Sequence, residues 1–91
     1  MELVADPDGM RRAAAKLRAR AANLKGIAAR LQSQVSGMVF AGPAADRFRS
    51  TVALRCQGIL GAAAEMDKLA DTFTRTAMSV ETQAGPGGVV R

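Results

Sequence analysis

The sequence contains no histidine, no tryptophan, no tyrosine and a single cysteine, Cys56. With no histidine and one thiol, the usual zinc ligand sets are excluded, as are the Ser-His and Cys-His pairs of nucleophilic catalysis. An internal disulfide is also excluded, and we interpret Cys56 as a small buried apolar residue. The acidic residues show no evident pair for acid–base chemistry. We therefore expect no enzymatic activity, no metal and no cofactor.

Long apolar runs are missing as well. No run approaches the roughly 20 residues that span a bilayer, so we expect no transmembrane segment. The N-terminal residues MELVADPDGMRR have no cationic start followed by an apolar stretch, as a secretory signal would.

Aromatic residues are limited to Phe40, Phe48 and Phe73. Alanine accounts for 19 of the 91 residues, so few of the apolar side chains are large. A chain of this length forms one domain with a thin core, and such domains are often marginally stable alone. The composition therefore favours oligomerisation.

Charge is positive and unevenly distributed. The chain has 13 Lys and Arg against 8 Asp and Glu, a net charge of +5. Basic residues dominate up to Arg55, and acidic residues outnumber basic ones from Cys56 onward. In a hairpin, segment 11–20 would lie opposite the acidic segment 65–81 and neutralise part of this charge. Cations nearer the turn would remain uncompensated: Lys25, Arg30, Arg47, Arg49 and Arg55.

The first half of the chain has a sustained helical pattern. Asp6-Pro7 is typical of an N-cap followed by proline in the first turn. Apolar residues then alternate at spacings of four and three, which is a heptad pattern. The pattern predicts a helix over about 7–37. Its apolar positions are Met10, Ala14, Leu17, Ala21, Leu24, Ala28, Leu31, Val35 and Met38.

The second half repeats this pattern after Gly42-Pro43, which indicates a second helix over about 43–82. One step is irregular, where Cys56 stands beside Arg55. Residues 84–91 contain Gly85-Pro86-Gly87-Gly88 and are predicted to be a flexible tail. The apolar positions are Ala45, Phe48, Val52, Cys56, Ile59, Ala63, Met66, Ala70, Phe73, Ala77 and Val80.

The predicted fold is all-α. Residues 1–83 form an antiparallel helix-turn-helix hairpin with its turn at about 38–42. Further apolar residues outside the two stripes (Ile27, Leu54, Leu60 and Leu69) widen the apolar surface, as in helices of larger bundles. We therefore expect two hairpins to form a four-helix bundle. The predicted hairpin and dimer interface consists of Leu17, Leu24, Leu31, Val35, Phe48, Val52, Ile59, Met66 and Phe73.

Two alanine-rich arms joined at Phe40-Ala41-Gly42 resemble the WXG superfamily, small helical proteins exported by type VII secretion (ESX) systems. Phe40-Ala41-Gly42 falls where that family has Trp-Xaa-Gly, and residues 43–48 resemble its continuation of small residues leading to an aromatic. Phenylalanine in place of tryptophan keeps the apolar ring but loses the indole N–H. The family's Tyr-x-x-x-Asp/Glu export signal is missing, because the chain has no tyrosine.

The resemblance implies a type VII secretion substrate or co-secreted partner subunit. Such a protein would be cytoplasmic before export and secreted without a cleaved signal peptide. The implied partner is a second copy, another small WXG protein or the helical leader of a larger effector, and the missing tyrosine signal implies that the partner carries it. Phe40 would lock the two arms together and contribute to a surface recognised by the secretion ATPase.

Two alternatives stay open. The first is a basic helical protein associated with nucleic acid, in which the first arm tracks phosphates. That arm has no aromatic side chain to stack on bases, so nucleic acid is the less favoured partner. The second is a cytoplasmic helical adaptor, similar to an antitoxin or chaperone, that is never exported. The basic residues of the first arm are Arg11, Arg12, Lys16, Arg18, Arg20, Lys25 and Arg30.

Overall fold

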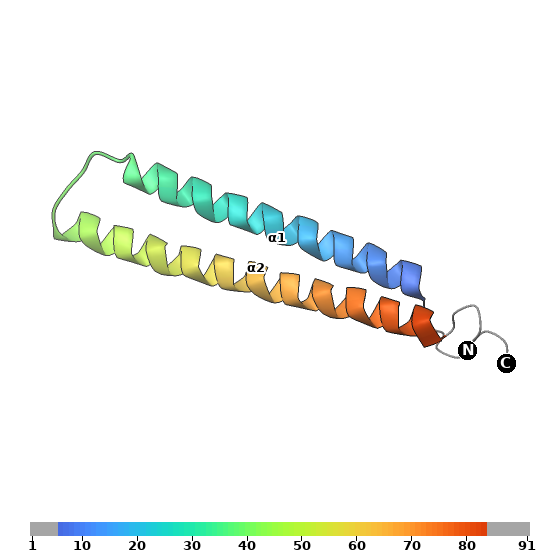
Figure 1. Ribbon diagram of the computed structural model, residues 1–91. Helices are drawn as coiled ribbons and strands as arrows, with labels where there is room; N and C mark the ends of the chain where they lie inside the picture. The colour runs from blue at the N-terminus through green and yellow to red at the C-terminus, as the bar shows by residue number, and fades with distance from the viewer. Residues whose placement is uncertain (1–5, 84–91) are drawn as a thin grey trace, which may run out of the picture.

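Two long helices account for nearly all of the residues that the structure describes. A computed structural model describes residues 6–83, so the predicted tail at 84–91 lies outside the described residues. Helix α1 covers Pro7–Ser36 and helix α2 covers Pro43–Gln83. They run antiparallel, side by side, and are joined by a loop at residues 37–42 (Figure 1). The predicted all-α helical hairpin is confirmed for this part of the chain.

Local signals explain where the helices begin and end. The Asp6 carboxylate accepts a hydrogen bond from the Gly9 amide (3.1 Å), which caps α1 before Pro7. At its other end, the Gly37 amide donates to the Ser33 carbonyl (3.1 Å). Gly42 precedes α2 and has a φ of +109°, a conformation that only glycine adopts without strain. Its carbonyl accepts the first hydrogen bond of α2, from the Asp46 amide (3.0 Å).

The core of the hairpin consists almost entirely of alanine. At spacings of seven, Ala14, Ala21 and Ala28 of α1 face a matching row in α2. Small side chains allow close helix packing, and the Cys56 thiol donates to the Ala28 carbonyl across the interface (3.6 Å). Within residues 6–83, no side chain larger than cysteine is fully buried. The buried residues of α2 are Ala45, Cys56, Ala63, Ala70 and Ala77.

This core makes a long, thin molecule. The radius of gyration is 20.6 Å and the extents are 71 × 21 × 17 Å, whereas a compact domain of similar size has a radius of gyration near ~13 Å. Two helices side by side have no further layer to cover their outer surfaces. Many of the large apolar residues therefore stay in contact with solvent.

One edge of the hairpin is polar and charged. Arg18 pairs with Asp71 (3.0 Å), and Arg11 pairs with Glu81. The predicted neutralisation between the two arms is thus confirmed. The hydrogen bond that Arg11 donates to the Glu81 carboxylate is the main cause that raises the pKa of Arg11 above its ordinary value, so its guanidinium stays charged. Each pair is solvent-exposed, and such pairs contribute little individually to stability.

Lys25 was expected to be uncompensated, but it pairs with Asp67 (2.9 Å). The pairing arises because Lys25 follows Ala21 by four residues, just as Asp67 follows Ala63. These two positions therefore meet along the polar edge.

Candidate interaction site: the apolar face and the turn

The large apolar residues predicted at the interface lie beside the alanine row instead of within it. Leu24 follows the buried Ala21 by three residues, and Met66 follows Ala63 in the same way. Lys25 and Asp67, each four residues after those alanines, meet on the polar edge. Positions three residues after the alanines therefore lie on the opposite side of the hairpin in both helices.

We call this opposite side the apolar face. All its members are half-buried, so the hairpin covers only part of each side chain. Seven of the nine predicted interface residues lie on this one surface. Three of these seven are in α1 and four are in α2. Its members are Met10, Leu17, Leu24 and Leu31 of α1, and Val52, Ile59, Met66, Phe73 and Val80 of α2.

Exposed side chains extend the apolar face outward. Ile27 is 39% exposed and Leu69 is 48% exposed. Each follows a buried alanine by six residues, which places it in the next row on the same side of its helix. An apolar strip that runs along both helices in this way is uncommon on a monomer and is typical of a surface that binds another protein.

Phe48 is more exposed than the half-buried members of the apolar face. Its side chain is 43% exposed and packs against Phe40, with ring centroids 6.1 Å apart. The residue seven before the buried Cys56 is Arg49, which takes the position that faces α1. Arg49 takes this position because of the irregular step at Arg55-Cys56. Seven residues before Cys56 is Arg49, whereas Phe48 is seven residues before Arg55.

Arg49, which the sequence predicted only as an uncompensated cation near the turn, instead holds the turn together. Its guanidinium lies over the Phe40 ring, 4.7 Å from the centroid. The Nη2 atom donates to the Phe40 carbonyl (2.7 Å) and lies 3.5 Å from the Met38 carbonyl. Asp46 lies 3.8 Å from the same guanidinium. The loop is thus attached to the first turns of α2 through one side chain.

The outer surface of the turn stays open. Phe40 is 39% exposed and Val39 is 99% exposed. The other two residues of the predicted turn motif, Ala41 and Gly42, are also exposed. The motif therefore combines a fixed backbone with an accessible apolar surface.

A small open pocket lies where the alanine row ends. Val35 of α1 and Arg49 of α2 occupy positions that alanine or cysteine holds further along, so larger side chains replace small ones. The resulting pocket has a volume of about 300 Å³. The predicted interface residues Val35 and Val52 both contribute to it. Its lining consists of Gln32, Val35, Ser36, Arg49, Val52 and Ala53.

Three observations concern metal ligands, membrane spans and the cysteine thiol. Across 6–83, no three His, Cys, Asp or Glu side chains gather as metal ligands. Neither described helix has a stretch long and apolar enough to cross a membrane. Cys56, the residue with a nucleophilic thiol, is fully buried.

No protein-family model matches the chain, and no match was found among curated proteins or among solved structures.

Proposed function

We propose that the chain is a WXG-like type VII secretion substrate or co-secreted partner subunit. In this proposal it acts by pairing its apolar face with a second helical hairpin to form a four-helix bundle. The single observation that supports this most is the half-exposed apolar face, which extends along both helices. The pairing partner is a second copy, another small WXG protein or the helical leader of a larger effector.

Energetics favour pairing. Full burial of one leucine, isoleucine, methionine or phenylalanine side chain is worth about 1.5–3 kcal/mol. Covering the exposed parts of the nine members of the apolar face would therefore stabilise the complex substantially. A hairpin whose buried residues are alanine and cysteine gains little from its own core.

The turn also supports a WXG-like protein. Phe40-Ala41-Gly42 stands between two helices of 30 and 41 residues. The positive φ of Gly42 gives a physical reason for glycine at the third position of the motif. The exposed part of the Phe40 ring is a candidate contact for the secretion ATPase, while its carbonyl and ring face are occupied by Arg49.

An export experiment tests the proposal. The tagged chain is expressed in a bacterium that carries its gene and the secretion system, with the secretion ATPase either intact or deleted. We expect the chain in the culture medium only when the ATPase is intact, with a retained marker protein reporting on lysis. Export that persists without the ATPase, or stable retention in both strains, would refute the proposal; retention in a complex would favour the non-exported adaptor.

The nucleic-acid alternative gains nothing from the structure. Arg11, Arg18 and Lys25 of the basic arm are already paired with carboxylates of α2. Binding to phosphates would have to compete with these pairs.

A further inference from the structure

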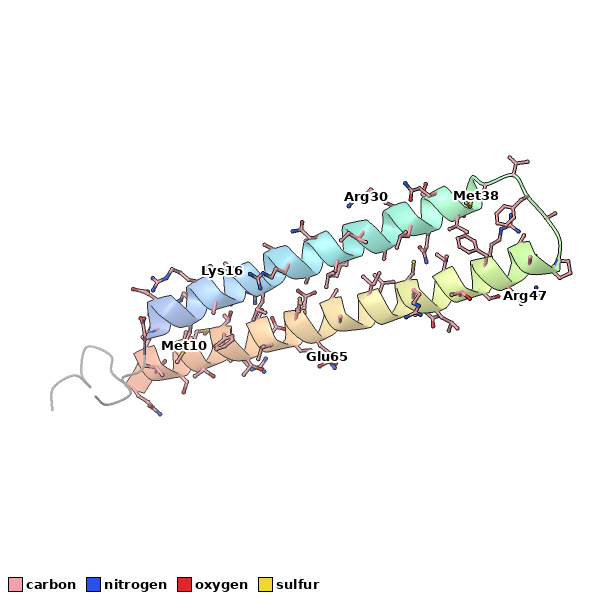
Figure 2. All side chains as sticks on the ribbon, turned by 180° about the vertical axis from the view of Figure 1, so that it is seen from behind. Met10, Lys16, Arg30, Met38, Arg47 and Glu65 are labelled. Carbon is pink, nitrogen blue, oxygen red and sulfur yellow. The ribbon has the colours of Figure 1, made fainter. Side chains whose placement is uncertain are left out.

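The α1 side of the apolar face is bordered by positive charge alone. Between Gly9 and Ser36 the chain has no acidic residue. The ion pairs formed among residues 6–83 involve neither Lys16, Arg20 nor Arg30. Figure 2 shows Lys16 and Arg30 projecting from α1 on the side away from α2.

These three cations are placed to meet a helix that covers the apolar face. Arg20 follows the buried Ala14 by six residues and so shares the outward row of Ile27. Lys16 and Arg30 each follow a buried alanine by two residues, which places them in the next row outward. In paired helices, charged side chains that flank an apolar stripe determine which partner and which orientation are preferred.

A second copy of the chain would neutralise little of this positive charge. Placing α1 beside the α1 of another copy brings the same cations together. Placing it beside α2 offers one acid, Glu65, in the flanking rows, together with one further cation, Arg55. Glu65 already lies 3.6 Å from Lys68 on its own helix. Figure 2 shows Glu65 on the side of α2 away from α1.

We infer that the partner is a different helical chain, with Asp and Glu side chains bordering its apolar stripe along α1. This inference rests on the proposed pairing through the apolar face and names the chemistry of the partner. Like-charge contacts disfavour self-pairing, whereas opposite charges across the same apolar contact speed association and select the partner.

A charge-reversed copy of the chain can serve as the probe partner. The double variant Arg20→Glu/Arg30→Glu keeps the members of the apolar face and gives α1 an acidic border. The matched control, Arg47→Glu/Arg75→Glu, makes the same change in net charge. Arg75 follows the buried Ala70 by five residues, and Arg47 precedes Arg49 by two, which is the same heptad position. Both therefore lie beyond the polar edge of α2 and away from the apolar face. Circular dichroism would verify that each variant is folded, and sedimentation would measure pairing with the wild-type chain.

We expect wild type to pair with the Arg20→Glu/Arg30→Glu variant at least about tenfold more tightly than with itself, and this preference should shrink at high salt. The control variant should stay within about twofold of wild-type self-pairing, because it leaves the contact unchanged. The neutral variant Arg20→Gln/Arg30→Gln should self-pair more tightly than wild type, which tests the same repulsion without a charge-reversed partner.

Wild-type self-pairing as tight as the mixed pair would overturn the inference and leave the proposed pairing intact. An equal gain with the control variant would also overturn it, since net charge alone would then explain the effect. If no mixture associates, pairing through the apolar face fails, and the inference fails with it.

Discussion

The guanidinium of Arg49 lies 4.7 Å over the ring of Phe40 and donates a 2.7 Å hydrogen bond to the Phe40 carbonyl. One side chain of α2 thus holds both the ring and the backbone of the residue at the centre of the turn. Because Arg49 also occupies the position that faces α1, it connects the turn to the end of the alanine row. The shape of the turn and the helix pairing therefore depend on the same residue.

Replacing Arg49 should loosen the turn. Arg49→Gln removes the cation over the Phe40 ring and the charged hydrogen bond, and we expect the free energy of unfolding to fall by about 1 kcal/mol. Arg47→Gln is the control, because Arg47 is exposed two residues earlier in the same helical turn. Urea unfolding followed by circular dichroism measures both. Equal unfolding free energies for the two variants would show that Arg49 does not hold the turn.

Enlarging a buried alanine should separate the helices. Ala21 is fully buried in the row that faces α2, so Ala21→Leu should lower the free energy of unfolding by about 1–3 kcal/mol through overpacking. The neighbouring exposed Ala22 provides the control variant Ala22→Leu, which adds the same volume to the surface. Thermal unfolding of both variants gives the comparison. A similar melting temperature for the two would contradict close packing at Ala21.

A charge placed in the apolar face should prevent assembly. Leu24→Asp puts an unpaired carboxylate at the centre of the proposed contact, at an expected cost of several kcal/mol. The control Gln57→Glu adds a carboxylate at an exposed position one residue after the buried Cys56, on the side of the polar edge and away from the apolar face. Light scattering of each variant mixed with the Arg20→Glu/Arg30→Glu chain reports the mass of the complex. An unchanged mass for Leu24→Asp would rule out the apolar face as the contact.

Two glycines inside α2 should limit its stability. A Cβ atom added at Gly58 or Gly61 would meet no atom within 4 Å other than its chain neighbours and the nearby backbone of its own helix. Alanine favours the helix interior over glycine by about 0.5–1 kcal/mol, so Gly58→Ala and Gly61→Ala should each raise the free energy of unfolding by that amount. Chemical denaturation at several protein concentrations separates this effect from assembly. A loss of stability in the single hairpin would indicate that either glycine has a conformation or contact not seen here.

Periodicity was sufficient to predict the two helices, their antiparallel pairing and the position of the turn. Asp6, Pro7, Gly42 and Pro43 act on the chain within a few residues, so their effects can be read without knowing the fold. The opposite charges of segments 11–20 and 65–81 likewise need only a hairpin to bring them together, as the Arg18–Asp71 pair illustrates.

Periodicity could not decide which half of the heptad pattern is buried. The alanine row and the row of larger apolar residues three positions later both repeat every seven residues. Which row is buried between the helices depends on how closely the two helices approach. In the hairpin, close approach buries Ala21 and leaves Leu24 at the edge. The same geometry brings Arg49, and not Phe48, to face α1.

The sequence by itself determined two amphipathic helices and a central glycine turn, because capping, propensity and apolar spacing are local properties. Only the tertiary structure decided that alanine fills the space between the helices and that the larger apolar residues form a half-exposed face. The physical reason is packing distance: small side chains let the backbones approach, and once they do, the larger side chains no longer fit between them.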